Sequence, residues 1–137
     1  MSFSRVRVST EATNRLKVLK GRTGLTPNVL CRIAFVLSLN EPGIPNQVGD
    51  EQGQEFNRFT LTGEWDQLVT ALLKERLVRD GLDPEGDLLP QFKAHLDRGI
   101  PLVYNRVKSL VDLDDLMPPL GSGPGLNTSA SEERING

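Results

Sequence analysis

The spacing of hydrophobic and polar positions divides the first forty residues into a strand and two helices. Residues 3–8 alternate with a period of two, which is typical of a strand: Phe3, Arg5 and Arg7 fall on one side, and Ser4, Val6 and Val8 on the other. Apolar positions then recur at helical spacing over roughly residues 10–22, and Gly24 is the expected C-cap. Thr26, followed by proline, predicts the start of a second helix over roughly residues 27–39.

This order of strand, helix, short turn and helix is that of a ribbon-helix-helix unit. Such units usually dimerise by pairing their strands, and β-ribbon proteins place strand side chains in a DNA groove. The second helix is apolar around nearly its whole circumference, with Arg32 as its single charge. A helix of this kind must be buried on all sides, so a subunit interface that includes Phe35 and Leu37 is the simpler explanation.

The remainder of the chain predicts a helical extension. Residues 40–55 are rich in glycine and proline and predict an irregular connection. The expected elements that follow are a short strand at 56–61 and helices over roughly 64–80, 88–98 and 101–111, with Gly99 separating the last two. Together they predict a mainly α fold: one domain over residues 1–117, with a ribbon-helix-helix-like unit at 3–40, a helical extension at 56–117, and a flexible tail at 118–137.

Charge divides the chain into a basic and an acidic part. The 137 residues have a formal net charge of −2, but residues 1–40 carry seven Lys/Arg and one acid, a charge of +6, which leaves −8 for the remainder. A basic segment of this kind favours an anionic partner, and a solvated helix face is the alternative. The candidate DNA contacts are its clustered cations: Lys17, Lys20, Arg22, Arg15, Arg5 and Arg7.

Residues for catalysis or metal binding are scarce. Cys31 and His95 are the single cysteine and the single histidine, and we expect a core residue and a structural or surface residue. The acidic segment 80–87 lacks the spacing of a calcium loop, and the carboxylates of Asp112, Asp114 and Asp115 are expected to cap a terminal turn. We therefore expect no catalytic residue, no metal site and no cofactor.

The same counts bear on location. A lone cysteine fits a reducing compartment, and the chain has no run of 18 apolar residues and no apolar region at its N-terminus typical of a secretory signal. These features predict a cytoplasmic protein without a membrane partner.

Two segments carry a resemblance to a known family. The run LKGRTGLTPNVLCRIAFVLSLNEPGIP at residues 19–45 resembles the signature of the DNA sulfur modification protein DndE family, and AHLDRGIPLVYNRV at 94–107 resembles its C-terminal helical segment. With FTLTGEWDQLVTALLKERL at 59–77, the resemblance covers about residues 3–115. It implies a part in the bacterial system that replaces a non-bridging phosphate oxygen of DNA with sulfur.

The resemblance also implies how such a protein acts. The expected function is a non-catalytic, oligomeric DNA-binding component that assembles to a tetramer, favours nicked duplex DNA and associates with the other modification proteins. Lys17, Lys20 and Arg22 are the expected DNA contacts within this resemblance. A ribbon-helix-helix transcriptional regulator and a scaffold that only assembles other proteins are the two alternatives.

Overall fold

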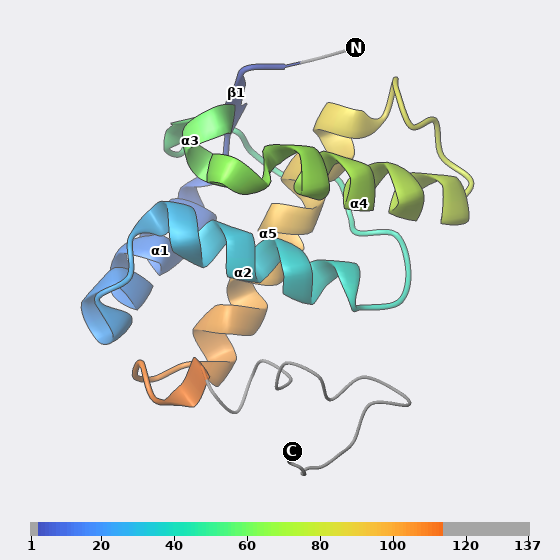
Figure 1. The fold of residues 1–137 in the computed structure, drawn as a ribbon. Coiled ribbons are helices and arrows are strands. Elements are labelled where there is room, and N and C mark those ends of the chain that lie inside the picture. The colour runs from blue at the N-terminus through green and yellow to red at the C-terminus, as the bar shows by residue number, and fades with distance from the viewer. Residues whose placement is uncertain (1–2, 114–137) are drawn as a thin grey trace, which may run out of the picture.

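The computed structural model describes residues 3–113, and its fold is mainly helical (Figure 1). The elements in chain order are β1 (Arg5–Arg7), α1 (Thr10–Thr23), α2 (Pro27–Leu39), β2 (Glu55–Asn57), α3 (Arg58–Thr62), the short 3-10 helix η1 (Gly63–Trp65), α4 (Asp66–Arg79) and α5 (Leu88–Arg106). The predicted mainly α class, with a strand and two helices at the N-terminus, is confirmed. The predicted tail at 118–137 lies outside the described residues.

The first two helices begin and end where their capping residues predict. Ser9 Oγ accepts a hydrogen bond from the Ala12 amide at 3.0 Å, and Thr26 accepts one from the Val29 amide at 3.5 Å. Gly24 ends α1 with a φ of 76°, a left-handed conformation that glycine adopts without strain. Side-chain caps and one glycine thus define both helices locally.

The N-terminal strand pairs within its own chain. β1 and β2 are antiparallel, with Val6 opposite Phe56 and Arg7 opposite Glu55. Val6 and Phe56 are buried while the arginines of β1 are exposed, so the predicted alternation is confirmed. In a ribbon-helix-helix dimer the strand pairs with a second copy. Here the partner strand comes from the connection after α2.

The predicted strand at 56–61 is wrong beyond its second residue. Asn57 Oδ1 accepts hydrogen bonds from the amides of Phe59 and Thr60 at 2.9 and 3.1 Å, which makes Asn57 the N-cap of α3. The chain therefore leaves the sheet immediately after β2 and enters a helix.

The predicted break at Gly99 is also wrong, because α5 is one continuous helix across the middle of the molecule (Figure 1). Gly99 lies where α5 crosses α2. A Cβ built there would lie 1.9 Å from the carbonyl oxygen of Ala34, so the missing side chain is what allows the two backbones to approach. Pro101 lies inside the helix, where it removes one backbone donor without ending the helix.

This crossing explains the apolar character of α2. Its residues pack against α5, α1 and α3 of the same chain, and Phe35 and Leu37 are only 2% and 7% exposed. The burial of Phe35 and Leu37 therefore does not require the predicted subunit interface, because contacts within the chain already bury both side chains.

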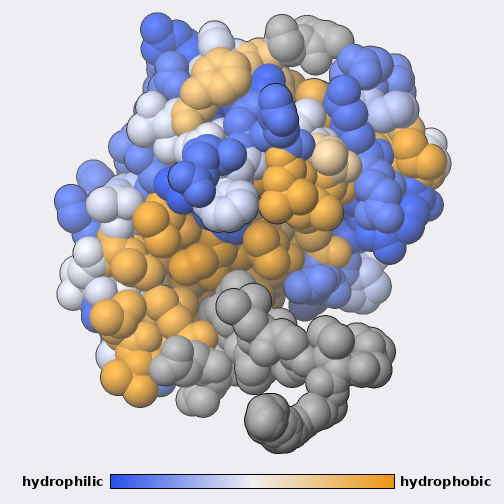
Figure 2. Space-filling view, in the orientation of Figure 1, coloured by the Kyte–Doolittle hydropathy of each residue, from blue (hydrophilic) through white to orange (hydrophobic). Residues whose placement is uncertain are grey.

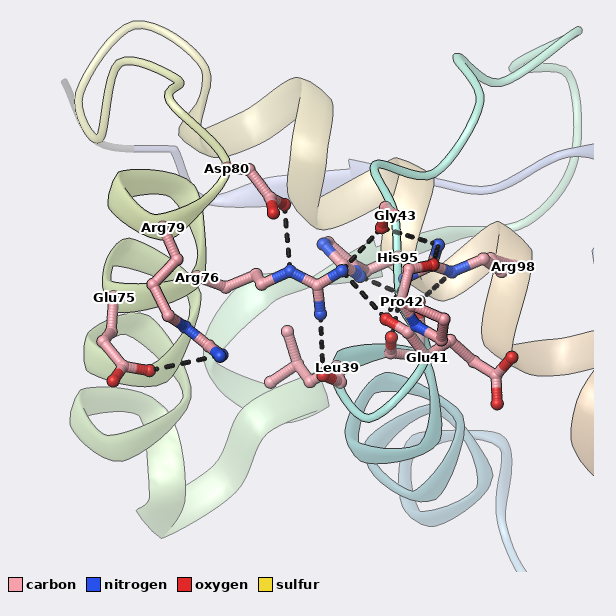
Figure 3. A network of polar contacts seen from close by, with 11 residues as sticks. Leu39, Glu41, Pro42, Gly43, Glu75, Arg76, Arg79, Asp80, His95 and Arg98 are labelled. Carbon is pink, nitrogen blue, oxygen red and sulfur yellow. Dashed lines mark hydrogen bonds and ion pairs between the residues drawn. The ribbon is translucent and has the colours of Figure 1, made fainter.

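Two arginines, the buried Arg76 and the half-buried Arg98, hold the connection that follows α2 (Figure 3). Arg76 from α4 donates hydrogen bonds to the carbonyls of Leu39, Glu41 and Gly43 and pairs with Asp80 at 2.9 Å. Arg98 from α5 donates to the carbonyl of Ser38 at 2.7 Å and to that of Gly43 at 2.9 Å. These contacts satisfy carbonyls at the helix end that have no partner within α2, and they place positive charge at the negative end of its dipole.

Candidate nucleic-acid interface

Two lysines of α1 form an exposed cationic flank. Lys17 and Lys20 are three positions apart, which places them about 60° apart around the helix axis. Both are exposed, and neither makes an ion pair with any residue between 3 and 113. Their charges are available to an external anion.

Arg15 and Arg22 lie on the other flank of the same helix. They are seven positions apart and so lie nearly in line along the helix. Each lies about 160° around the helix axis from the lysine two positions away. Both guanidinium groups lie over the Tyr104 ring of α5, at 5.4 and 4.6 Å from its centroid. The cations that the sequence places in one cluster are therefore divided between two flanks of α1.

Arg22 also binds the backbone at the end of α5. Its Nη1 donates to the carbonyl of Tyr104 at 3.0 Å and to that of Val107 at 3.4 Å, at the end of α5. Arg15 pairs with Glu11 one turn earlier at 3.0 Å. Of these two arginines, Arg22 has no acidic partner within the described residues, but part of its donor capacity is already used.

The two arginines of β1 share one carboxylate of the same chain, so one positive charge of the three groups remains. Arg5 and Arg7 pair with the two carboxylate oxygens of Glu55 at 2.8 and 3.0 Å, and Arg7 also donates to the carbonyl of Gly53. Both are exposed, so each such pair contributes little to stability. Their shared carboxylate nevertheless makes this strand a weaker anion-binding surface than α1.

The structure adds two cations that sequence reasoning missed. Arg106 and Lys108 lie at the end of α5, are exposed, and make no ion pair with any other described residue. The Lys108 ammonium lies 5.9 Å from the centroid of the Tyr104 ring, which brings it to the Arg15 and Arg22 flank. In the sequence they are two basic residues close to Tyr104 and more than 80 positions after α1. No local pattern predicts that they lie near α1 in the fold.

The single cysteine lies in the core. Cys31 is fully buried in α2, and burial raises the pKa of its thiol to about 12. Its thiolate is therefore scarce at neutral pH, which agrees with the predicted core residue and opposes a nucleophile.

The single histidine is buried and neutral. Its Nδ1 lies 2.8 Å from Ser38 Oγ, and that oxygen already accepts a hydrogen bond from Arg98 Nε at 2.9 Å. The Ser38 hydroxyl thus links the imidazole ring of His95 to the guanidinium group of Arg98. Burial, together with the charges of Arg98 and Arg76, lowers the pKa of His95 to about 4, and the predicted structural role is confirmed.

The acidic segments serve as turns and caps. Asp83 accepts a hydrogen bond from the Glu85 amide, and Asp87 accepts one from the Asp83 amide at 2.8 Å. Asp112 accepts from the amides of Lys108 and Ser109, as predicted for a cap, whereas Asp114 and Asp115 lie outside the described residues. Within residues 3–113, no three His, Cys, Asp or Glu side chains are grouped so that they could hold a metal ion.

A second surface is apolar. Only Leu73 and Leu77 of α4 enter the core, while Trp65, Leu68 and Leu72 remain 50%, 51% and 39% exposed. They face α2 across a groove of about 360 Å³, and apolar side chains gather across this face in Figure 2. The other wall of the groove comes from α2: Arg32, Ile33, Phe35 and Val36.

No helix between residues 3 and 113 is both long and apolar enough to cross a membrane.

Comparison with known proteins gives one family. The family model described as DNA sulphur modification protein DndE matches residues 5–110. The fold is similar to the crystal structure of DndE from Escherichia coli B7A involved in DNA phosphorothioation modification, with 28% identity and a TM-score of 0.64, over 75% of this chain and 98% of that chain. It is also similar to the crystal structure of a DndE mutant involved in DNA phosphorothioation, with 26% identity and a TM-score of 0.60, over 76% of this chain and 99% of that one. A comparison with curated protein sequences found no match.

Proposed function

Because this chain belongs to the DndE family of DNA sulphur modification proteins, we propose that it is a non-catalytic, DNA-binding subunit of the bacterial phosphorothioation machinery. The observation that carries the proposal is the exposed cationic surface of α1, where Lys17 and Lys20 have no ion-pair partner within residues 3–113. Exposed, clustered cations of this kind bind backbone phosphates without reading sequence.

A non-catalytic role agrees with the chemistry of the chain. The two residues best suited to act as nucleophile or base, Cys31 and His95, are both buried, with their pKa values moved away from neutral pH. We propose that sulfur chemistry belongs to other proteins of the system, with which this subunit associates in the cytoplasm. Its preferred ligand, by resemblance to the family, is nicked duplex DNA.

Binding to intact, nicked and single-stranded DNA, measured by fluorescence anisotropy across a salt series, tests this function. We expect a nick preference without sequence preference, and a loss of affinity in K17Q/K20Q. The matched control is R79Q, which removes an exposed cation of α4 that pairs with Glu75. Tight binding to a single operator sequence would favour a transcriptional regulator, and no binding at low salt would favour a scaffold.

The apolar groove supports a further part of the proposal, homo-oligomerisation to a tetramer. Leu68 and Leu72 are exposed beside Trp65, and they lie across the groove from Val36 of α2, which is 38% exposed. Contiguous exposed apolar surface is typical of a protein interface. We propose that a second copy covers this groove.

Sedimentation measures the assembly directly. L68E/L72E should lower the molar mass of the wild-type oligomer, because charge would be buried in an apolar interface. V78E is the matched control, since Val78 of the same helix is 63% exposed and does not line the groove. An L68E/L72E variant that sediments with the wild-type mass would exclude this groove as the interface.

A further inference from the structure

We propose that α1 lies in the major groove of duplex DNA and contacts backbone phosphates of both strands, one strand from each flank. Lys17 and Lys20 serve the first flank, and Lys108, with Arg22 beside Tyr104, serves the second. This inference rests on the proposed DNA-binding function and adds to it a mode of docking and a second contact surface.

Helix α1 carries positive charge on both of its flanks. Its buried side is defined by Ala12, Leu16 and Leu19, and the lysine and arginine flanks diverge from that side in opposite directions. The sole acid of the helix is Glu11, which pairs with Arg15. A helix with cations on both flanks matches an anion on each side better than a single anionic surface.

Uncharged residues lie between the two flanks of α1. Asn14, Val18 and Gly21 are exposed along the outward side of α1, none carries a charge, and an added Cβ at Gly21 would meet nothing within 4 Å. An α-helix with its side chains is about 10–12 Å wide, and the major groove is about 12 Å wide. Small outward residues let such a helix enter the groove while longer cations reach the phosphates at its edges.

Tyr104 brings the cations of the second flank together. Three cations lie within 6 Å of its ring centroid, Arg22 at 4.6 Å, Arg15 at 5.4 Å and Lys108 at 5.9 Å. The carboxylates on this side are Glu11, which pairs with Arg15, and Asp112, which accepts hydrogen bonds from the backbone amides of Lys108 and Ser109. Neither forms an ion pair with Arg22 or Lys108 within the described residues. An anionic phosphate would relieve the repulsion between these two charges.

In a ribbon reader, Arg5 and Arg7 of β1 would enter the groove. Both are held by Glu55 of the same chain, and β1 is already paired with β2. Helix α1 carries cations that have no carboxylate partner within the described residues. The DNA contact is therefore on the helix and not on the strand.

The test compares the salt dependence of binding to nicked duplex DNA for four variants of the full chain. Each neutralised phosphate contributes about −0.9 to the slope of log K against log salt. K108Q should reduce the slope by about that amount and weaken binding roughly eightfold at 0.1 M salt. K17Q/K20Q should reduce it by about twice as much, and K17Q/K20Q/K108Q should show the sum, whereas R79Q should match wild type.

A second measurement addresses the two strands. Ethylation of single phosphates should interfere with binding on both strands that border one major groove. K108Q should weaken the interference on one strand only, where Arg22 remains. An unchanged slope and footprint in K108Q, with K17Q/K20Q impaired, would overturn the two-flank arrangement and leave the proposed function standing. A wild-type protein that binds no DNA at low salt would overturn both. Circular dichroism of each variant excludes unfolding, which is not expected because Lys17, Lys20 and Lys108 are exposed.

Discussion

Replacing Gly99 by alanine should destabilise the protein, although alanine favours helices over glycine. In a helix interior, alanine is more favourable than glycine by about 1 kcal/mol. That preference would predict a gain in stability for a glycine inside α5. The contact with α2 at Ala34 reverses the sign.

The magnitude follows from the distances at the crossing. The added Cβ would lie 1.9 Å from the Ala34 oxygen and 2.5 Å from the Ala34 carbonyl carbon, whereas ordinary contact begins near 3.4 Å. The atoms in the way are backbone, so no rotamer change relieves the overlap, and the helices must separate by about 1.5 Å. Overpacking of this kind typically costs about 1–3 kcal/mol, and loosened packing between two central helices adds to it. Offset by the helix preference, overpacking alone leaves a net loss of up to about 2 kcal/mol, and the loosened packing increases this loss.

Urea denaturation followed by circular dichroism, at one fixed protein concentration, measures the change. Gly21→Ala is the matched control, because Gly21 lies within α1 and its added Cβ meets nothing within 4 Å. It should show the helix preference alone and gain up to about 1 kcal/mol. The two substitutions should therefore shift the midpoint in opposite directions. Gly99→Ala with a midpoint at or above wild type would refute the steric argument.

Three further predictions concern buried groups. The pKa of His95 is lowered from an ordinary 6.5 to about 4 in the folded protein. The free energy of unfolding should therefore be highest above pH 6.5 and fall by about 3 kcal/mol as the pH falls through 4. Urea denaturation of His95→Gln should lack this pH dependence. Arg76→Met should lower the free energy of unfolding by about 3 kcal/mol, since it leaves Asp80 and several carbonyls unpaired, whereas Arg79→Met should change it by less than about 0.5 kcal/mol; equal effects in urea denaturation would contradict the role of Arg76. Cys31 should resist a thiol reagent in the native state and react on unfolding, and rapid native labelling would contradict its burial.

Local signals predicted the helices that local interactions define. Ser9, Thr26 and Gly24 act on backbone groups a few residues away, so the bounds of α1 and α2 are readable from the sequence. Gly99 was misread because a glycine that ends a helix and a glycine that admits a crossing helix look the same in sequence. Only the position of Ala34, more than 60 residues earlier, separates the two.

The candidate site could likewise be predicted from the sequence only in part. The cations of α1 could be found from composition, but their division into two flanks required the packed position of the helix. The pairing of Arg5 and Arg7 depends on Glu55, and the position of Lys108 near α1 depends on Tyr104 of α5. Such long-range partners follow from tertiary packing, which no local pattern encodes. The burial of Phe35 within one chain could not be predicted for the same reason, since α5 packs on α2 from a distance in sequence.

The crossing of α2 and α5 also determines when the chain can fold during its synthesis. The second helix leaves the ribosome early, yet the helix that covers it is encoded about fifty residues later. Until α5 emerges, the nascent chain exposes an almost wholly apolar α-helix, a state prone to aggregation. We therefore expect the N-terminal half to gain stable structure only after residue 106 has cleared the exit tunnel, and ribosome-bound chains stalled before that point to be held by chaperones.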